Sequence, residues 1–387
     1  MQIFCYDFAS DGLNLLGICE NATSILWTRK FFSGDEFAVR LPATPENIKL
    51  FSKLHVVELM LDNSNSDSYY CGIITDFDIS KTVSGEELTV SGMSPDGFLE
   101  RRILRYWDTG DTFMGIINKN AGDTALAARQ FPCTSFMISV DFNGVYGEAM
   151  LNKKLSEYVK QAGQFLGVGL QSYIRHNFVD ITTGKYRKPF IAIEARRGID
   201  RSISQTVNKA VVFSDAYENA TDFEYSYSDN GTVNAAIVYS EAQYNENSKV
   251  DVVAYEQWFD ANTEGYERSE KIAKIKAVTA EESRGTSGTW TILDSTATAS
   301  LAEEKANSLY ADATEFFNCK LLLPKSYDDI VQLGDIVTAQ NTRWGVTSDK
   351  RITEISHQIT SGGTDALAYL GETYKNTFEI LNNRQEG

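Results

Sequence analysis

The chain has 387 residues, enough for two to four domains that each bury a core, and its 42% hydrophobic and 23% charged residues are ordinary for a globular protein. We expect neither a signal peptide nor a membrane-spanning segment, because the N-terminus lacks a basic region and no run of 18 apolar residues occurs. A net charge of −17 argues against a dedicated nucleic-acid binder, although DNA could pass such a surface without binding.

Residues Met1–Val90 predict antiparallel β-structure, because short apolar runs alternate with turn residues. Thr44 and Pro45 predict the start of a short helix that runs to about Lys53. The loop Asp62–Ser68 lacks the glycine and glutamate of a calcium-binding loop, so a polar hairpin tip is favoured. The expected strands are Ser24–Arg29, Glu36–Leu41, His55–Leu61, Tyr69–Ile79 and Glu87–Ser91.

The stretch Ser91–Asp111 closes this β-rich region and leads into the first helical pattern. Its turn residues Ser94–Gly97 lie between two apolar segments, which predicts a strand, a turn and a strand. Arg101 and Arg102 follow the turn. A solvated or internally paired arginine pair is the simplest interpretation of these two residues.

Residues 112–200 predict a separate α+β region of strand, helix, strand and strand. Thr112–Lys119 is expected to form a helix, and apolar residues every three or four positions from Leu151 to Leu166 predict a longer one that ends at Gly167. The expected strands are Phe136–Phe142, Gln171–Asp180 and Tyr186–Ala195, the last two joined as a hairpin.

Residues from Ser202 onward return to a β-pattern, interrupted by one helix. Ser300 and Glu303 predict a capping box, with an apolar stripe from Ala302 to Phe317. A polar, mobile loop is expected at Glu281–Gly288. The expected strands are Ala210–Phe213, Asp222–Tyr227, Ala235–Tyr239, Asp251–Phe259, Ile272–Val278, Asn318–Leu323, Asp335–Gln340, Gly345–Thr360 and Ala366–Leu370.

No motif in the sequence indicates catalysis or a cofactor. The five scattered cysteines form no C-x-x-C pair, which indicates reduced, mostly buried thiols and no zinc site. His55, His176 and His357 lie in strand patterns without a neighbouring nucleophile pattern, which favours structural roles. We therefore expect no catalytic, cofactor-binding or metal-binding residues.

Charge is unevenly distributed along the chain. Ser214–Asp229 contains five acidic and no basic residues, whereas Lys185–Arg201 contains six basic and two acidic residues. Such asymmetry is typical of faces that meet complementary partners, although a solvated face is the default interpretation.

The order of several short motifs resembles tail proteins of Gram-positive siphophages. The motif near the C-terminus is shared by several tail components and is less specific. The segments that carry the resemblance are Tyr6-Asp7, Trp27 with Arg29 and Lys30, 34–42, 72–74, 88–92, 99–103, Leu333-Gly334-Asp335-Ile336-Val337, 351–355 and Leu370-Gly371.

The resemblance implies a tail hub, or the structural N-terminal part of a tail-associated lysin, similar in fold to the baseplate hub of contractile tails. It implies a homotrimeric ring with an axial channel, a tail tube or distal tail protein above it, a spike or fibre below it, and a place in the virion tail after synthesis in the host cytoplasm. No lytic domain is recognisable before Gly387, which favours a stand-alone hub.

This family plan predicts a β-rich α+β fold with two small antiparallel barrel-like domains. Residues 1–110 are expected to form the first barrel, and residues 111–200 an α+β domain. Residues 201–299 are expected to form part of a second barrel. Residues 300–387 are expected to form a helix and the β-segment that completes this second barrel. The residues expected at subunit contacts are Arg101, Arg102, Lys185, Arg187, Lys188, Arg196 and Arg197.

Two other functions remain open from the sequence. A tail-associated, peptidoglycan-degrading hydrolase could hide its catalytic pair among 53 carboxylates. A receptor-binding module would need an aromatic pocket, but the aromatic residues follow strand patterns and are better explained as core.

Overall fold

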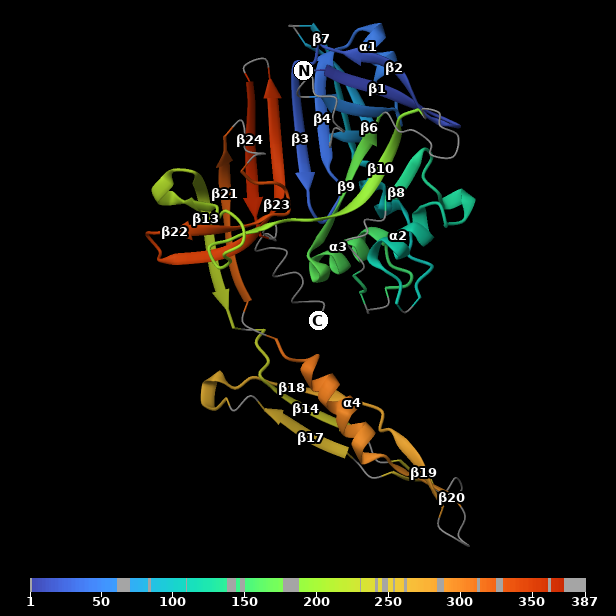
Figure 1. The fold of residues 1–387 in the computed structure, drawn as a ribbon, viewed down its shortest axis with the longest axis vertical. Coiled ribbons are helices and arrows are strands. Elements are labelled where there is room, and N and C mark those ends of the chain that lie inside the picture. Colours follow the sequence, from blue (N-terminus) through green and yellow to red (C-terminus); the bar gives the residue numbers. More distant parts are fainter. Residues whose placement is uncertain are drawn as a thin grey trace. The chain divides into compact units, whose positions relative to one another are not determined.

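The structure of the chain is a computed structural model that forms two compact units, Met1–Phe223 with Asn318–Gly387 and Glu224–Phe317 (Figure 1). The division predicted at residues 110, 200 and 299 stays a prediction. The structure describes residues 2–60, 70–82, 85–108, 110–137, 144–146, 150–176, 188–229, 231–240, 243–245, 250–252, 255–260, 263–283, 289–311, 314–324, 330–360 and 363–371.

A sheet of 14 strands is the frame of the first unit, and its main path is β13-β21-β24-β23-β3-β4-β7-β6-β5-β1-β2. Strand β22 pairs with β23, β11 and β12 beside this path. The path is open at β13 and β2, so the described strands form no closed barrel, but the predicted β-rich α+β class is confirmed. The strands are β1 (Gln2–Ala9), β2 (Gly12–Cys19), β3 (Ser24–Lys30), β4 (Glu36–Pro42), β5 (Val56–Met60), β6 (Cys71–Thr82), β7 (Gly85–Met93), β11 (Asp200–Arg201), β12 (Val212–Ser214), β13 (Ala220–Ser228), β21 (Thr314–Leu323), β22 (Ile336–Asn341), β23 (Val346–Thr360) and β24 (Gly363–Leu370).

Alternation along these strands buries one of their faces in a shared core. Trp27 on β3 stacks on Phe37 of β4, with ring centroids 4.8 Å apart. Helix α1 (Pro45–Leu50) begins where the sequence predicts, because the Thr44 side-chain oxygen accepts a hydrogen bond from the Asn47 backbone N–H. The helix ends at Leu50, earlier than predicted. The predicted hairpin tip Asp62–Ser68 lies outside the described residues; only the strands on either side of it are described.

The hairpin predicted within Ser91–Asp111 is wrong. β7 ends at Met93, and Pro95–Arg101 forms the 3-10 helix η1. Phe98 and Leu99 of η1 point into the core, and an added Cβ on Gly34 would lie 2.2 Å from the Gly97 Cα. Proline at the first position starts a helical turn as readily as a β-turn, and this close packing against the β3–β4 turn stabilises the helical form.

The predicted strand–helix–strand–strand region is confirmed as β8 (Thr134–Met137), α3 (Leu155–Leu166), β9 (Val168–Arg175) and β10 (Phe190–Arg197). β10 lies between the other two strands, parallel to β8 and antiparallel to β9. α3 begins later than predicted, after Asn152 adopts a left-handed φ of 69°. Gly167, with φ 67°, ends α3 as predicted.

Helix α2 (Phe113–Ala121) packs beside α3 over this small sheet (Figure 1). Its Phe113 ring stacks on Tyr158 of α3 with centroids 5.8 Å apart, and both side chains are fully buried. The core around them is continuous with residues of η1, β1 and β5, so the helical region and the large sheet share one interior.

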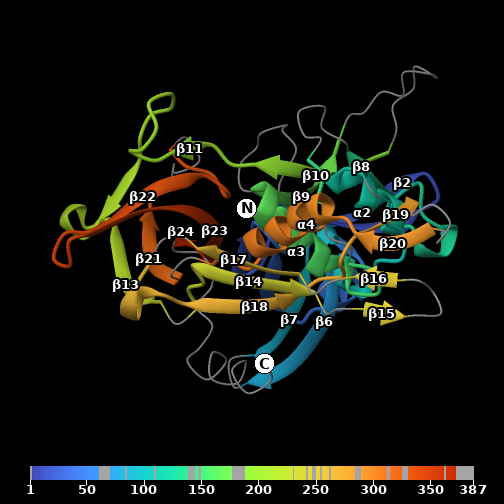
Figure 2. The same ribbon diagram turned by 90° about the horizontal axis from the view of Figure 1, so that it is seen from below.

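The second unit contains two smaller sheets and one helix. The sheet orders are β17-β14-β18 and β15-β16-β20-β19, and α4 runs along one face of the first (Figure 2). Its core is small, consisting of Ala236, Val238, Ala302 and Ala306 with a few partly buried neighbours. The elements are β14 (Ala235–Ser240), β15 (Gln243–Asn245), β16 (Val250–Val252), β17 (Tyr255–Asp260), β18 (Glu270–Lys274), β19 (Thr279–Ser283), β20 (Thr289–Leu293) and α4 (Ser295–Asn307).

Four predictions for this unit need correction. Asp294, and not Ser300, caps α4, because its side chain accepts a hydrogen bond from the Ala297 N–H directly after β20. The helix ends at Asn307, so Phe317 lies on β21 and not on the helical stripe. The segment predicted as one strand at Asp251–Phe259 belongs to two strands in different sheets, and the predicted mobile loop begins within β19.

Candidate assembly interface

The arginine pair of the sequence motif belongs to a larger group of cations. We define the basic surface as Arg101, Arg102, Arg105, Arg129, Lys153 and Lys154. The segment after η1 runs beside the segment that enters α3: the Leu104 N–H donates to the Lys153 carbonyl at 2.9 Å, and the Leu155 N–H donates to the Arg102 carbonyl at 2.8 Å. Two stretches fifty residues apart thus bring their cations together.

Arg129 crosses from the short 3-10 helix η2 (Ala127–Arg129) to the same place. Its guanidinium donates to the Ile103 carbonyl at 2.5 Å, while Arg102 donates to the Arg129 carbonyl at 3.1 Å and stacks on the Phe131 ring. Arg101 stacks on Phe98, with its Cζ 4.4 Å from the ring centroid. These contacts fix the arginine stems, and no acidic side chain among the described residues pairs with them.

None of the six cations forms an ion pair within the part of the chain that the structure describes. Arg105 hydrogen-bonds to the neutral Asn152 side chain, and Lys153 and Lys154 are exposed. Partial burial, reinforced by Arg129 and Arg101, lowers the pKa of Arg102. Unpaired cations side by side in a chain of net charge −17 indicate a surface suited to an acidic partner.

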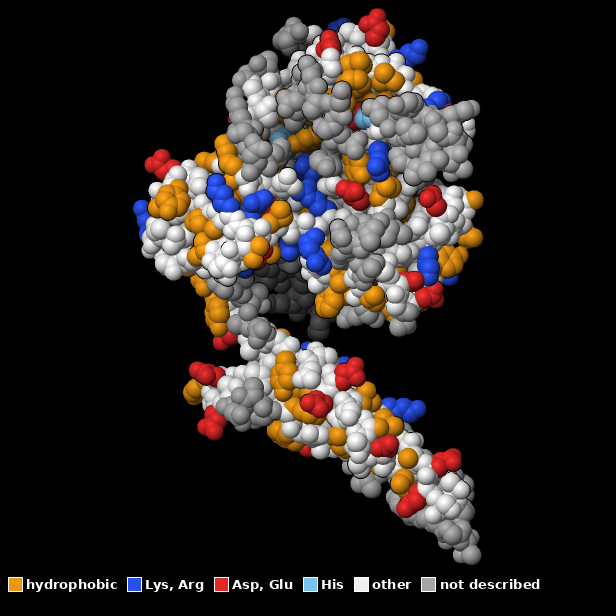
Figure 3. Space-filling view, viewed as in Figure 1, with side chains coloured by type: hydrophobic (Ala, Val, Ile, Leu, Met, Phe, Trp, Pro, Cys, Tyr) orange, Lys and Arg blue, Asp and Glu red, His pale blue; other side chains and the backbone are white. Residues whose placement is uncertain are grey.

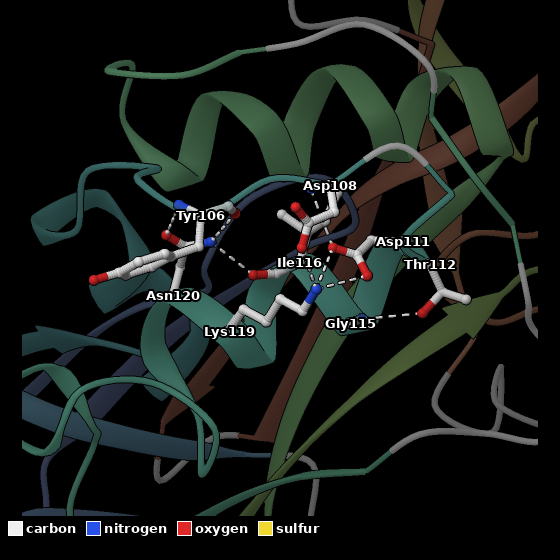
Figure 4. A network of polar contacts seen from close by, with 8 residues as sticks. All are labelled: Tyr106, Asp108, Asp111, Thr112, Gly115, Ile116, Lys119 and Asn120. Atoms are coloured by element: carbon white, nitrogen blue, oxygen red, sulfur yellow. Dashed lines mark hydrogen bonds and ion pairs between the residues drawn. The ribbon is translucent and has the colours of Figure 1, made fainter.

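A polar network holds the next residues against α2 (Figure 4). The Thr112 hydroxyl caps the helix by accepting from the Gly115 N–H, and Lys119 forms ion pairs with Asp108 and Asp111 at 2.8 and 2.7 Å. The fully buried Asn120 side chain accepts from the Arg105 and Tyr106 N–H groups and donates to two carbonyls, those of Tyr106 and Ile116. The backbone that carries Arg105 is therefore firmly positioned.

Arg196 and Arg197, at the end of β10, have partners within the chain. Arg196 hydrogen-bonds to the side chains of Gln171 and Gln332, and Arg197 donates to the Leu166 carbonyl at the end of α3. A cation at a helix C-terminus is favourable, so Arg197 has a clear structural role. Figure 3 shows Lys and Arg side chains gathered where β10 and β23 approach each other.

The remaining candidate lysines and arginines divide into described and undescribed residues. Lys188 forms an ion pair with Asp11 at 2.8 Å and a hydrogen bond to Asn14, both near the β1–β2 turn. Lys185 and Arg187 lie outside the described residues. The basic surface and the end of β10 are therefore two separate groups of candidates.

The C-terminal motif Leu333-Gly334-Asp335 forms a structural corner. The buried Asp335 carboxylate accepts from the Ile199 N–H, the Gln332 N–H and the Arg201 guanidinium, which joins β11 to β22. Gly334 has φ 93°, and an added Cβ would lie 2.2 Å from the Phe31 ring. Only glycine fits this corner, which explains the motif by packing and not by chemistry.

A buried carboxyl pair, Asp35 and Asp96, joins the β3–β4 turn to η1. The Asp35 N–H donates to the Ser94 hydroxyl at 2.7 Å, and Ser172 of β9 donates to the Asp96 carboxyl at 2.6 Å. The residue Asp35 is half-buried as a whole, but its carboxyl group is enclosed. This burial raises the pKa of Asp35 to about 7, although the nearby Arg29 cation acts to lower it. Burial also raises the pKa of Asp96. Each acid further disfavours ionisation of its neighbour.

The three histidines have structural partners. His55 hydrogen-bonds to the Leu50 carbonyl, His176 contacts the buried Glu58 carboxyl at 3.0 Å, and His357 contacts the Tyr70 hydroxyl. Burial, with a smaller contribution from Arg29, lowers the pKa of His357 to about 4, so it is neutral at pH 7.

Among the described residues, no group of three or more His, Cys, Asp or Glu side chains is arranged to hold a metal ion. No described helix is long and apolar enough to cross a membrane.

Sequence reasoning found Arg101 and Arg102 but missed Arg105, Arg129, Lys153 and Lys154. The backbone pairing that assembles these six residues is non-local, and no local pattern encodes it. The weak signal in the sequence was the number of cations after η1 and before α3, in a chain that is otherwise rich in acids.

The fold matches those of phage tail proteins. A tail protein from Neisseria meningitidis MC58 superposes with a TM-score of 0.50 at 13% identity over 96% of each chain. The 43 kDa tail protein of prophage MuSo2 from Shewanella oneidensis gives a TM-score of 0.51 at 10% identity over 96% of this chain and 98% of that one.

At such low identity these two matches establish a shared fold alone. A comparison with curated protein sequences gives no match. The family model for Siphovirus ReqiPepy6 Gp37-like proteins matches residues 6–372, nearly the whole chain. The chain therefore belongs to the Siphovirus ReqiPepy6 Gp37-like protein family.

Proposed function

We propose that this protein is a structural hub of a phage tail or of a phage-derived tail particle. In this proposal three copies form a ring around an axial channel, with the tail tube or a distal tail protein on one side and a spike or fibre on the other. The siphovirus family and the fold shared with tail proteins support a tail component. The basic surface, whose cations lack acidic partners among the described residues, is the observation that most directly supports an assembly role.

The subunit contacts in this proposal include Arg101 and Arg102 on the basic surface. We assign Arg196, at the end of β10, to a second contact. Acidic side chains line the channel, so that DNA passes without binding, as the net charge of −17 suggests. A basic channel wall would contradict this part of the proposal.

The proposal assigns no catalysis to the chain. Incubation of purified protein with peptidoglycan is expected to release no soluble fragments. Release that survives further purification would support the alternative of a cell-wall hydrolase.

Labelling tests the location. An antibody fragment against this chain should mark the end of the tail tube in images of assembled particles. A label on the capsid, or along the whole length of the tube, would contradict the hub assignment.

A further inference from the structure

Two arginines of the basic surface are held in place by backbone carbonyls. The Arg102 Nε–H donates to the Arg129 carbonyl at 3.1 Å, and its Nη1 donates to the Arg101 carbonyl at 3.4 Å. The Arg129 Nε–H donates to the Asn120 carbonyl at 3.1 Å, and its Nη2 donates to the Ile103 carbonyl at 2.5 Å. Each guanidinium group is therefore anchored at two points, and all four acceptors are neutral.

The two anchored groups keep N–H donors that the described chain does not use. Among the described residues, Nη2 of Arg102 and Nη1 of Arg129 have no hydrogen-bond partner. The Arg102 Cζ lies over the Phe131 ring, 4.7 Å from its centroid. A guanidinium that stacks on a ring keeps the edge of its plane available for hydrogen bonds, and carboxylates bind along that edge.

The two guanidinium groups also lie close enough for their charges to interact. Partial burial comes first among the causes that lower the pKa of Arg102, and the charge of Arg129 comes second. Neither arginine forms an ion pair within the described chain, and the exposed acids Glu100 and Glu157, which lie near the basic surface in the sequence, form none with them. Two fixed cations without a counter-charge favour an anion between them.

We infer that Arg102 and Arg129 bind a carboxylate of a neighbouring tail protein, and that the other four cations of the basic surface attract the acidic segment that carries it. A carboxylate has two oxygens in one plane, and each can accept a hydrogen bond from an unused arginine N–H. The inference rests on the proposed function, because it gives the acidic neighbour an anchor. It also assigns a contact to Arg129, which lies outside the Arg101-Arg102 motif.

The charge of the whole chain favours a protein carboxylate over a nucleic acid. A net charge of −17 repels a long phosphate backbone at a distance, whereas an acidic side chain on a docked protein brings a single charge to the site. Side chains that are fixed before binding lose little conformational freedom when the partner arrives. Arginine is also enriched among the residues that dominate protein interfaces.

Exchange of arginine for lysine separates a built site from a surface that is merely basic. Arg102→Lys with Arg129→Lys keeps all six charges but removes the planar N–H groups and their anchoring. The probe is a short, fluorescently labelled oligoglutamate peptide, titrated with dilute full-length protein and followed by fluorescence anisotropy. We expect wild type to bind the peptide and the double variant to bind it at least about tenfold more weakly.

A matched control exchanges two exposed arginines elsewhere in the first unit. Arg40→Lys with Arg343→Lys should leave peptide binding within about twofold of wild type, because neither residue belongs to the basic surface. An equal loss in this control would show that the exchange acts without a specific site and would overturn the inference.

A measurement on unsubstituted protein guards against a folding defect in the variants. The Nε–H groups of Arg102 and Arg129 are hydrogen-bonded to carbonyls, which slows their exchange with water and allows their NMR signals to be followed. Addition of the peptide should shift both signals. The Nε–H signal of Arg201, which is ion-paired with the buried Asp335 at 2.9 Å, should stay in place.

The state of the wild-type protein distinguishes the two sources of the carboxylate. A trimer that still binds the peptide would indicate another tail protein as the neighbour. A trimer that excludes the peptide would indicate a second copy of the chain, and the double lysine variant should then weaken the trimer at least about tenfold. Exclusion of the peptide by a trimer that the double variant does not weaken would overturn the inference.

The remaining outcomes separate this site from the proposed function. Equal peptide binding by wild type and the double lysine variant, or no binding by a wild-type monomer, would overturn the site and leave the hub proposal intact. An oligothymidylate of equal charge that binds more tightly than the peptide would reassign the surface to nucleic acid and also overturn the inference. Arginine-dependent peptide binding by a protein that never forms trimers would support the site and remove the ring.

Discussion

The two units of this chain differ in how completely they bury their apolar side chains. The first unit combines a 14-stranded sheet with α2, α3 and η1 around extended cores. Several of its glycines pack directly against the Phe31 and Phe37 rings. The second places one helix on one face of a three-stranded sheet and leaves Trp258 and Ile272 exposed. Each unit leaves some large apolar side chains exposed, such as Phe77 and Phe165 in the first unit and Trp258 and Ile272 in the second, but the first unit has by far the larger buried core.

Charge separates the two units in the same way. The second unit is strongly acidic, while the first contains a group of cations with no acidic partners among its described residues. The two units therefore differ in the size of their cores and in the sign of the charge that they carry.

The largest effect is expected at the tightest corner of the first unit. Gly334→Val combines a left-handed φ with overlap of the Phe31 ring and should destabilise the first unit by about 4 kcal/mol or more. Hydrogen exchange of peptides from β22 and β23 would measure the loss. Gly345→Ala, at φ 67° in open space, is the matched control and should cost only about 1 kcal/mol. Equal costs at both glycines would contradict the packing argument.

Core truncation compares the two units next. Trp27→Ala removes a fully buried ring and should lower the free energy of unfolding of the first unit by about 3–5 kcal/mol. Val238→Ala, in the small core under α4, should cost the second unit less, about 2 kcal/mol. Denaturant titration followed by peptide-level hydrogen exchange reports each unit separately. A larger cost at Val238 would reverse the comparison.

Counted per pH unit, the smallest effect is that of pH on the buried carboxyl pair. Burial raises the folded-state pKa of Asp35 to about 7, above its unfolded value, so the folded state holds a proton that the unfolded state has released. The resulting stability is fully present below about pH 4 and is lost as pH rises to about 7, by roughly 1 kcal/mol per pH unit.

Asp35→Asn, which is neutral at every pH, isolates this term. The stability of wild type relative to the variant should fall between pH 5 and pH 7.5, measured as the difference in free energy of unfolding. A constant difference across this range would show that Asp35 is ionised in the folded state.

Much of the fold was predictable because its signals are local. Thr44 with Pro45, Thr112 and Gly167 place helix ends through hydrogen bonds and backbone angles that involve a few adjacent residues. The 3-10 helix η1 was missed because Pro95 starts turns and helical turns alike, and the packing of Gly34 against Gly97 decides between them.

The candidate site was only partly predictable. Arg101 and Arg102 stand next to each other in the sequence, so their pattern was visible. Arg129 and Lys153 join them through hydrogen bonds to segments about 26 and 50 residues away, which no local periodicity encodes.

The central claim is that three copies form a ring, and the mass of the native assembly tests it most directly. Native mass spectrometry of purified protein, and of the subunit released intact from tail particles, should give a species of three times the 43.2 kDa chain mass. A stable 43.2 kDa monomer in both preparations would contradict the account.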